Sequence, residues 1–144
     1  MSAKSITLLQ IEDNSDDLIF TERALSRIGA AVDLHVAWDG EEVKEGLSKN
    51  KVVRMSYPTP DVILLDLDLP RMNGFEVLSW IKSQSHLQMI PVFVFTGSIR
   101  SEDVQKALSL GASCTYQKPS HPQAWETILT DVLAKASPSP RPNP

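Results

Sequence analysis

The chain has 144 residues, of which 42% are hydrophobic and 22% are charged, and its net charge at pH 7 is −4. This length suffices for one domain with a complete core, and the negative charge gives no general attraction to nucleic acid or to an anionic membrane. No apolar run reaches the roughly 20 residues that cross a bilayer, no signal-peptide pattern opens the chain, and the single cysteine, Cys114, excludes an internal disulfide. We therefore expect a cytoplasmic protein that binds neither nucleic acid nor membrane.

Short apolar segments alternate with amphipathic segments along the sequence. The apolar segments predict strands at residues 6–11, 32–37, 62–65, 92–95 and 113–118. The amphipathic segments predict helices at residues 15–28, from 39 to about 50, from 73 onward, at 101–110 and at 122–136. Asn14 or Ser15, Asp39 and Asn73 are suitable N-caps, and Gly29 and Gly111 are suitable helix ends. Residues 137–144 alternate proline with polar residues, which indicates a disordered tail after a domain at residues 1–136.

Five strands that alternate with five helices predict βαβ units, and hence an α/β fold with a parallel sheet and right-handed crossovers. The segment Val62–Leu65 is apolar throughout, without polar alternation, which is typical of a central strand buried on both faces.

Polar residues stand where four of these strands end. Glu12 and Asp13 follow the first strand, Asp66 follows the third, Thr96 follows the fourth, and Lys118 closes the fifth. The carboxyl ends of parallel strands share one edge of the sheet, where ligands bind in open α/β folds. We therefore expect three carboxylates, a hydroxyl and an ammonium group to converge there.

This combination of groups favours phosphoryl chemistry assisted by a metal ion. Carboxylates that repel one another need a counter-ion, and carboxylate oxygens suit Mg²⁺. Lys118 and Thr96 could bind phosphoryl oxygens, and Gly97 would let the backbone approach them. An aspartate such as Asp66 can form an aspartyl phosphate while the metal ion neutralises charge.

Each of these residues alone has a simpler interpretation, and only their joint placement is specific. An acid at a strand end is commonly a turn residue or a helix cap. Asp16 and Asp17 fall in the first turn of a helix, where they favour the helix dipole, and we interpret them as structural. The side chain of Asp68, two residues after Asp66, could point to solvent or into the site; in the site it would affect how fast a phosphoryl group is lost.

The pattern resembles the receiver domains of two-component response regulators from about Ser5 to Ala136. The matching segments are Glu12–Asn14, Leu65–Gly74, Thr96–Gly97, Gly111–Ala112 and Lys118–Pro119. The resemblance implies a flavodoxin-like fold with strand order 2-1-3-4-5, and phosphorylation of Asp66 by a histidine kinase or phosphotransfer protein. It also implies Mg²⁺ ligation by Asp13, Asp66 and the backbone carbonyl of Asp68, with Glu12 acting through water. Thr96 and Lys118 would hold the phosphoryl oxygens.

Two further features bear on the resemblance. The loop at Tyr57–Asp61 is similar to that of stand-alone receivers of the phytochrome-associated type. By analogy with the receiver family, we expect the surface around residues 100–133 to bind an unknown output partner or a second copy of the chain in a homodimer. Many receivers carry an aromatic residue three positions before the lysine, but here that position holds Thr115, and Tyr116 follows it. A shift of one residue reverses the side-chain face of a strand unless a bulge restores it. We therefore hypothesise that signalling depends on loop and helix shifts after Thr96.

Two other functions fit parts of the pattern. Asp66, Asp68, Thr96 and Lys118 also occur in the order of the haloacid-dehalogenase-like phosphatases. That family places further acidic metal ligands after the lysine, where this chain has only Glu126 and Asp131, in its last predicted helix. The other alternative is a receiver-like interaction module that is never phosphorylated. We expect a phosphoacceptor signalling protein and not an enzyme, with slow self-dephosphorylation at most.

Overall fold

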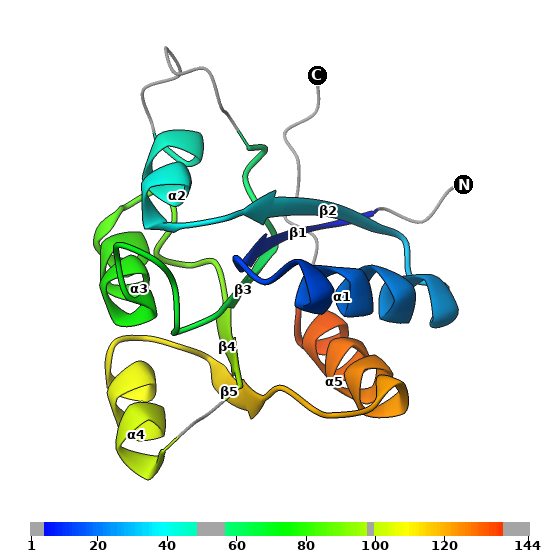
Figure 1. Ribbon diagram of the computed structural model, residues 1–144. Coiled ribbons are helices and arrows are strands. Elements are labelled where there is room, and N and C mark those ends of the chain that lie inside the picture. The colour runs from blue at the N-terminus through cyan, green and yellow to red at the C-terminus, as the bar shows by residue number, and fades with distance from the viewer. Residues whose placement is uncertain (1–4, 49–56, 98–99, 137–144) are drawn as a thin grey trace, which may run out of the picture.

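Figure 1 shows a computed structural model of the protein, which describes residues 5–48, 57–97 and 100–136. Its centre is a five-stranded parallel sheet, made of β1 (Ile6–Ile11), β2 (Val32–Ala37), β3 (Val62–Leu65), β4 (Val92–Thr96) and β5 (Cys114–Gln117). The strand order is β2-β1-β3-β4-β5, which confirms the predicted flavodoxin-like topology. The predicted tail lies outside the described residues.

Helices cover both faces of the sheet. The helices α1 (Ser15–Arg27) and α5 (Pro122–Lys135) lie on one face, and α2 (Gly40–Gly46), α3 (Gly74–Ser83) and α4 (Ser101–Ser109) lie on the other (Figure 1). None of the helices in the described ranges is long and apolar enough to cross a bilayer.

The core has two parts because strand side chains alternate between the faces of the sheet. Leu9, Ile63 and Val94 pack under α2, α3 and α4, whereas Leu64 and Phe93 pack against α1 and α5. All four residues of β3 are buried, as its uninterrupted apolar sequence predicts. The sheet is therefore anchored on both sides, and its strand ends are held in fixed positions.

The predicted N-caps are present. The side chain of Asn14 accepts hydrogen bonds from the backbone amides of Asp16 and Asp17 at 2.9 and 3.2 Å. Asp39 and Asn73 cap the next two helices in the same way, at 2.9 and 3.0 Å. These caps satisfy amide groups that have no partner inside a helix, and they fix where each helix leaves the edge of the sheet.

One helix is shorter than the sequence predicts. The helix α2 ends at Gly46 and not near residue 50, because the chain returns over it at Tyr57. The amide of Tyr57 donates to the carbonyl of Gly46 at 3.0 Å, and a Cβ atom on Gly46 would lie only 2.1 Å from the Tyr57 ring. This contact joins segments on either side of residues 49–56 and has no signal within the helix sequence.

Candidate functional site

The predicted site residues are held at one edge of the sheet by backbone hydrogen bonds to the neighbouring strand. The amide of Glu12 donates to the carbonyl of Ala37 at 2.9 Å, and that of Asp66 donates to Ile11 at 3.1 Å. The amide of Lys118 donates to the carbonyl of Thr96 at 2.8 Å. Each functional residue therefore extends a strand pairing by one step, which places its side chain within reach of the others.

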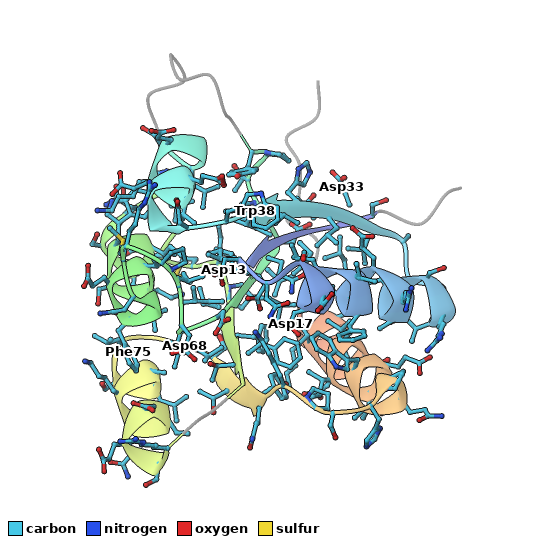
Figure 2. All side chains as sticks on the ribbon, viewed as in Figure 1. Asp13, Asp17, Asp33, Trp38, Asp68 and Phe75 are labelled. Carbon is cyan, nitrogen blue, oxygen red and sulfur yellow. The ribbon has the colours of Figure 1, made fainter. Side chains whose placement is uncertain are left out.

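Three carboxylates form the acidic part of the site. Glu12, Asp13 and Asp66 each offer an oxygen, and these oxygens all lie within 4.8 Å of one another. Glu12 and Asp66 are 1% and 5% exposed, whereas Asp13 is exposed. Figure 2 shows Asp13 and Asp68 close to the strand ends. A set of hard oxygen ligands with one open side fits a divalent ion that keeps some of its waters.

The Asp66 carboxylate is held at both oxygens. Its Oδ1 atom accepts from the hydroxyl of Thr96 at 3.0 Å and from the backbone amide of Asp68 at 3.1 Å. Its Oδ2 atom contacts the ammonium of Lys118 at 2.9 Å. The predicted hydroxyl and ammonium therefore converge on Asp66, in a region where Thr96 is fully buried.

The ammonium of Lys118 is shared among three carboxylates. It contacts Glu12 at 2.5 Å, Asp17 at 2.8 Å and Asp66 at 2.9 Å. Burial alone would lower the pKa of Lys118, but the hydrogen bonds to these carboxylates raise its pKa above the usual value. Burial and the neighbouring Asp66 raise the pKa of Glu12 to about 8, against the opposing effect of Lys118. The site is thus a compact cluster of opposite charges that is buried at Glu12 and Asp66 and open to solvent at Asp13.

Asp17 is a site residue that the sequence interpretation missed. It lies in the first turn of α1, where an acid is sufficiently explained by the helix dipole. In the structure its Oδ2 atom contacts Lys118, a residue 101 positions further along the chain. Figure 2 shows Asp17 at the start of α1, beside the strand ends. The helix dipole alone therefore does not account for Asp17, because its carboxylate also contacts Lys118.

The side chain of Asp68 points toward the site. Its Oδ2 atom lies 3.4 Å from the Thr96 hydroxyl, although the residue as a whole is exposed. Gly97 is exposed as well, and a Cβ atom there would meet no atom of the described residues within 4 Å. Both residues lie at the open rim, where a group bound to Asp66 would emerge.

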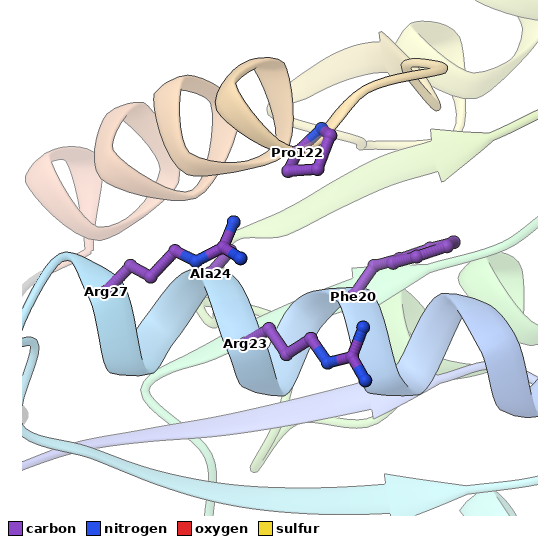
Figure 3. Close-up of a pocket in the computed structure, with 5 residues that line it drawn as sticks. All are labelled: Phe20, Arg23, Ala24, Arg27 and Pro122. Atoms are coloured by element: carbon purple, nitrogen blue, oxygen red, sulfur yellow. The ribbon is translucent and has the colours of Figure 1, made fainter.

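A shallow pocket lies apart from the acidic cluster, between α1 and α5 (Figure 3). It is lined by Phe20, Arg23, Ala24, Arg27 and Pro122. None of the predicted site residues lines it, and it holds no carboxylate. The pocket is a partly apolar groove that carries two arginines, and it is separate from the site.

A parallel αβ sandwich with acids, a threonine and a lysine at its strand ends defines the receiver class of signalling proteins. The family model of the response regulator receiver domain matches residues 8–130. The response regulator Rcp1 of Synechocystis is 33% identical over 111 residues, which are 77% of this chain and 75% of that protein. The chain belongs to the response regulator receiver domain family.

Solved structures agree with this assignment. The Mn²⁺-bound form of response regulator Rcp1 has a TM-score of 0.83 at 28% identity, over 94% of this chain and 99% of that one. The phosphorylated cyanobacterial phytochrome response regulator RcpA has a TM-score of 0.80 at 29% identity, over 95% and 100% of the two chains. The protein is thus a response regulator of two-component phosphorelay signalling, similar to those of phytochromes.

Proposed function

We propose that Asp66 accepts a phosphoryl group from a phosphohistidine of a histidine kinase or phosphotransfer protein. An oxygen of Asp66 would form a bond to phosphorus while the bond from phosphorus to the histidine nitrogen breaks, and the imidazole would keep the electron pair. The observation that carries this proposal is the convergence of Thr96 and Lys118 on the two oxygens of Asp66 at 3.0 and 2.9 Å. These groups can follow the new phosphoryl oxygens with little movement.

We further propose that Mg²⁺ is the physiological metal ion, held by Asp13, Asp66 and the backbone carbonyl of Asp68, with Glu12 acting through water. The clustered oxygens support this donor set, and a similar protein, Rcp1, has a Mn²⁺-bound form. The ion would neutralise charge as the phosphoryl group transfers. Lys118 and Thr96 would bind the phosphoryl oxygens, and Gly97 would leave room for them.

The protein would act as a switch with slow self-dephosphorylation and not as an enzyme on a small substrate. The phosphatase alternative needs acids after Lys118 that reach the site. One of the two downstream acids, Asp131, instead accepts a hydrogen bond from Tyr116 and contacts Lys135 at 2.9 Å. The switch would pass its output to a partner protein in the cytoplasm, and a homodimer remains a prediction.

Labelling by acetyl phosphate tests the proposal. Wild type should gain one phosphoryl group per chain in intact-mass spectra, only when Mg²⁺ is present, and Asp66→Asn should gain none. Asp33→Asn is a matched control, because Asp33 is an exposed acid in β2 that contacts His35. Absence of labelling in wild type with bound Mg²⁺ would support the interaction module, and turnover of a generic phosphate ester would support the phosphatase. Size measurement of both forms would test the homodimer.

A further inference from the structure

Lys118 contacts three carboxylates, and phosphorylation of Asp66 would change how these contacts are distributed. An ammonium group has three N–H donors, and Glu12, Asp17 and Asp66 each accept one contact. Phosphorylation would turn the Asp66 carboxylate, which has one negative charge, into an acyl phosphate whose three terminal oxygens carry up to about two negative charges. The contact of Lys118 with the Asp66 carboxylate would then be replaced by a contact with a phosphoryl oxygen. Lys118 can bind a second phosphoryl oxygen only if its contact with Glu12 or with Asp17 weakens.

The surroundings of Glu12 and Asp17 decide which of these two contacts is given up. The side chain of Glu12 is 2% exposed, whereas that of Asp17 is 17% exposed. A buried carboxylate that loses its cation is costly, because no water replaces the contact. Asp17 lies nearer to solvent, in the first turn of α1, and can exchange Lys118 for water at the lowest cost.

We propose that Asp17 is a positioning residue that competes with the phosphoryl group on Asp66 for the ammonium of Lys118. This inference rests on the proposed function of Asp66. In the unphosphorylated protein, Asp17 holds Lys118 toward α1 and so ties the first turn of α1 to the end of β5. In the phosphorylated protein, Lys118 turns to the phosphoryl oxygens and that tie weakens.

The competition sets how long the phosphoryl group persists. In hydrolysis, water forms a new bond to phosphorus, the bond from phosphorus to the Asp66 oxygen breaks, and a carboxylate, inorganic phosphate and a proton result. If Lys118 keeps its contact with Asp17, that N–H donor is not available to the phosphoryl oxygens. The phosphoryl group is then bound less firmly. Removal of the Asp17 charge should therefore stabilise the phosphorylated form.

Asp16 provides a matched control in the same turn. Its amide donates to the same Asn14 oxygen as that of Asp17, and its substitution by Asn removes the same charge from the same helix end. Lys118 contacts Asp17, and no contact between Lys118 and Asp16 accompanies it in the structure. The difference between Asp17→Asn and Asp16→Asn therefore isolates the contact with Lys118 from the helix dipole.

The test measures loss of the phosphoryl group after labelling with acetyl phosphate and removal of the donor. Asp17→Asn should lengthen the lifetime by about threefold or more relative to Asp16→Asn, and Asp17→Glu should restore a value near wild type. The same substitution is also made in a Lys118→Met background, provided that this variant can be labelled to a measurable extent. There, Asp17→Asn should not change the phosphoryl lifetime. Urea unfolding of each variant separates these effects from a loss of stability.

An Asp17→Asn lifetime equal to or shorter than that of Asp16→Asn would overturn the inference, as would an undiminished effect in the Lys118→Met background. If Lys118→Met cannot be labelled, the lifetimes of Asp17→Asn, Asp17→Glu and Asp16→Asn alone decide. Wild type that takes no label would overturn the proposed function itself. The two failures are therefore distinguishable in one set of measurements.

Discussion

The hydroxyl of Tyr116 donates a hydrogen bond to the carboxylate of Asp131 in α5, which holds its ring on the α1 and α5 side of the sheet. The pairing of β4 and β5 is continuous, with Val94 opposite Thr115 and Phe95 opposite Tyr116. No bulge in this pairing therefore turns Tyr116 to the face on which many receivers carry the aromatic residue. Thr115 lies on the side of α3 and α4, as the shift of one residue predicts.

We predict that Tyr116 contributes to stability and not to the switch. Tyr116→Phe should lower the free energy of unfolding by about 1 kcal/mol or less, since it removes one partly exposed hydrogen bond. Urea unfolding measures this loss, and the phosphoryl lifetime and the phosphorylation-dependent binding of a partner should not change. A role for the usual position would instead appear if Thr115→Ala abolished that binding while Tyr116→Ala preserved it.

Gly74 should be intolerant of any side chain because α3 starts against the loop that carries Asp66. A Cβ atom on Gly74 would lie 2.5 Å from the Leu67 Cα atom and 2.6 Å from the Asp66 carbonyl oxygen, and both are backbone atoms. Gly74→Ala should cost about 1–3 kcal/mol of stability, the range for overpacking, and should slow the labelling of Asp66.

Gly97→Ala is the control for this steric effect. Within the part of the chain that the structure describes, a Cβ atom on Gly97 meets no atom within 4 Å, so the change in unfolding free energy should stay within about 0.5 kcal/mol. Equal destabilisation by the two substitutions in urea would show that the contact of Gly74 with Leu67 and Asp66 is not the cause.

The stability of the metal-free protein should fall as pH rises from about 5 to 8.5. The folded protein raises the pKa of Glu12 from 4.5 to about 8, so the folded state binds more protons than the unfolded state between these values. The slope of unfolding free energy with pH is then negative. At a pH below both pKa values, the Glu12 carboxyl is protonated in the folded and the unfolded state alike. At a pH above both pKa values, the folded state bears the full cost of burying the charged carboxylate.

Glu12→Gln should remove this slope. In urea unfolding with a chelator present, the variant should gain stability relative to wild type as pH rises, while divalent-ion affinity should fall. In wild type, protons compete with the ion for Glu12, so affinity should weaken below about pH 8. Parallel stability curves for the two proteins across this range would contradict the role of Glu12.

Hydrophobic patterning and strand ends are local signals, and they predict the parallel sheet and the convergence of Asp66, Thr96 and Lys118 at one edge. The strand order is implied only by the resemblance to receiver domains. The sequence does not predict the contact of Asp17 with Lys118, because an acid in a first helical turn already has a sufficient local explanation. The early end of α2 also depends on a distant residue, Tyr57. Contacts of this kind depend on how elements pack and leave no periodic pattern.

The direction of the Asp68 side chain, which the sequence left open, leads to a last prediction. Its Oδ2 atom lies 3.4 Å from the Thr96 hydroxyl, which also donates to Asp66. A phosphoryl group on Asp66 would therefore meet a second negative charge at the rim. Asp68→Asn removes that charge and leaves Thr96 free to donate to the phosphoryl group, so the phosphoryl lifetime should lengthen by about two- to threefold. The lifetime is measured as for Asp17→Asn, with Asp33→Asn as the control for loss of an acid elsewhere. Identical lifetimes in Asp68→Asn and wild type would show that the rim carboxylate has no part in the loss of the phosphoryl group.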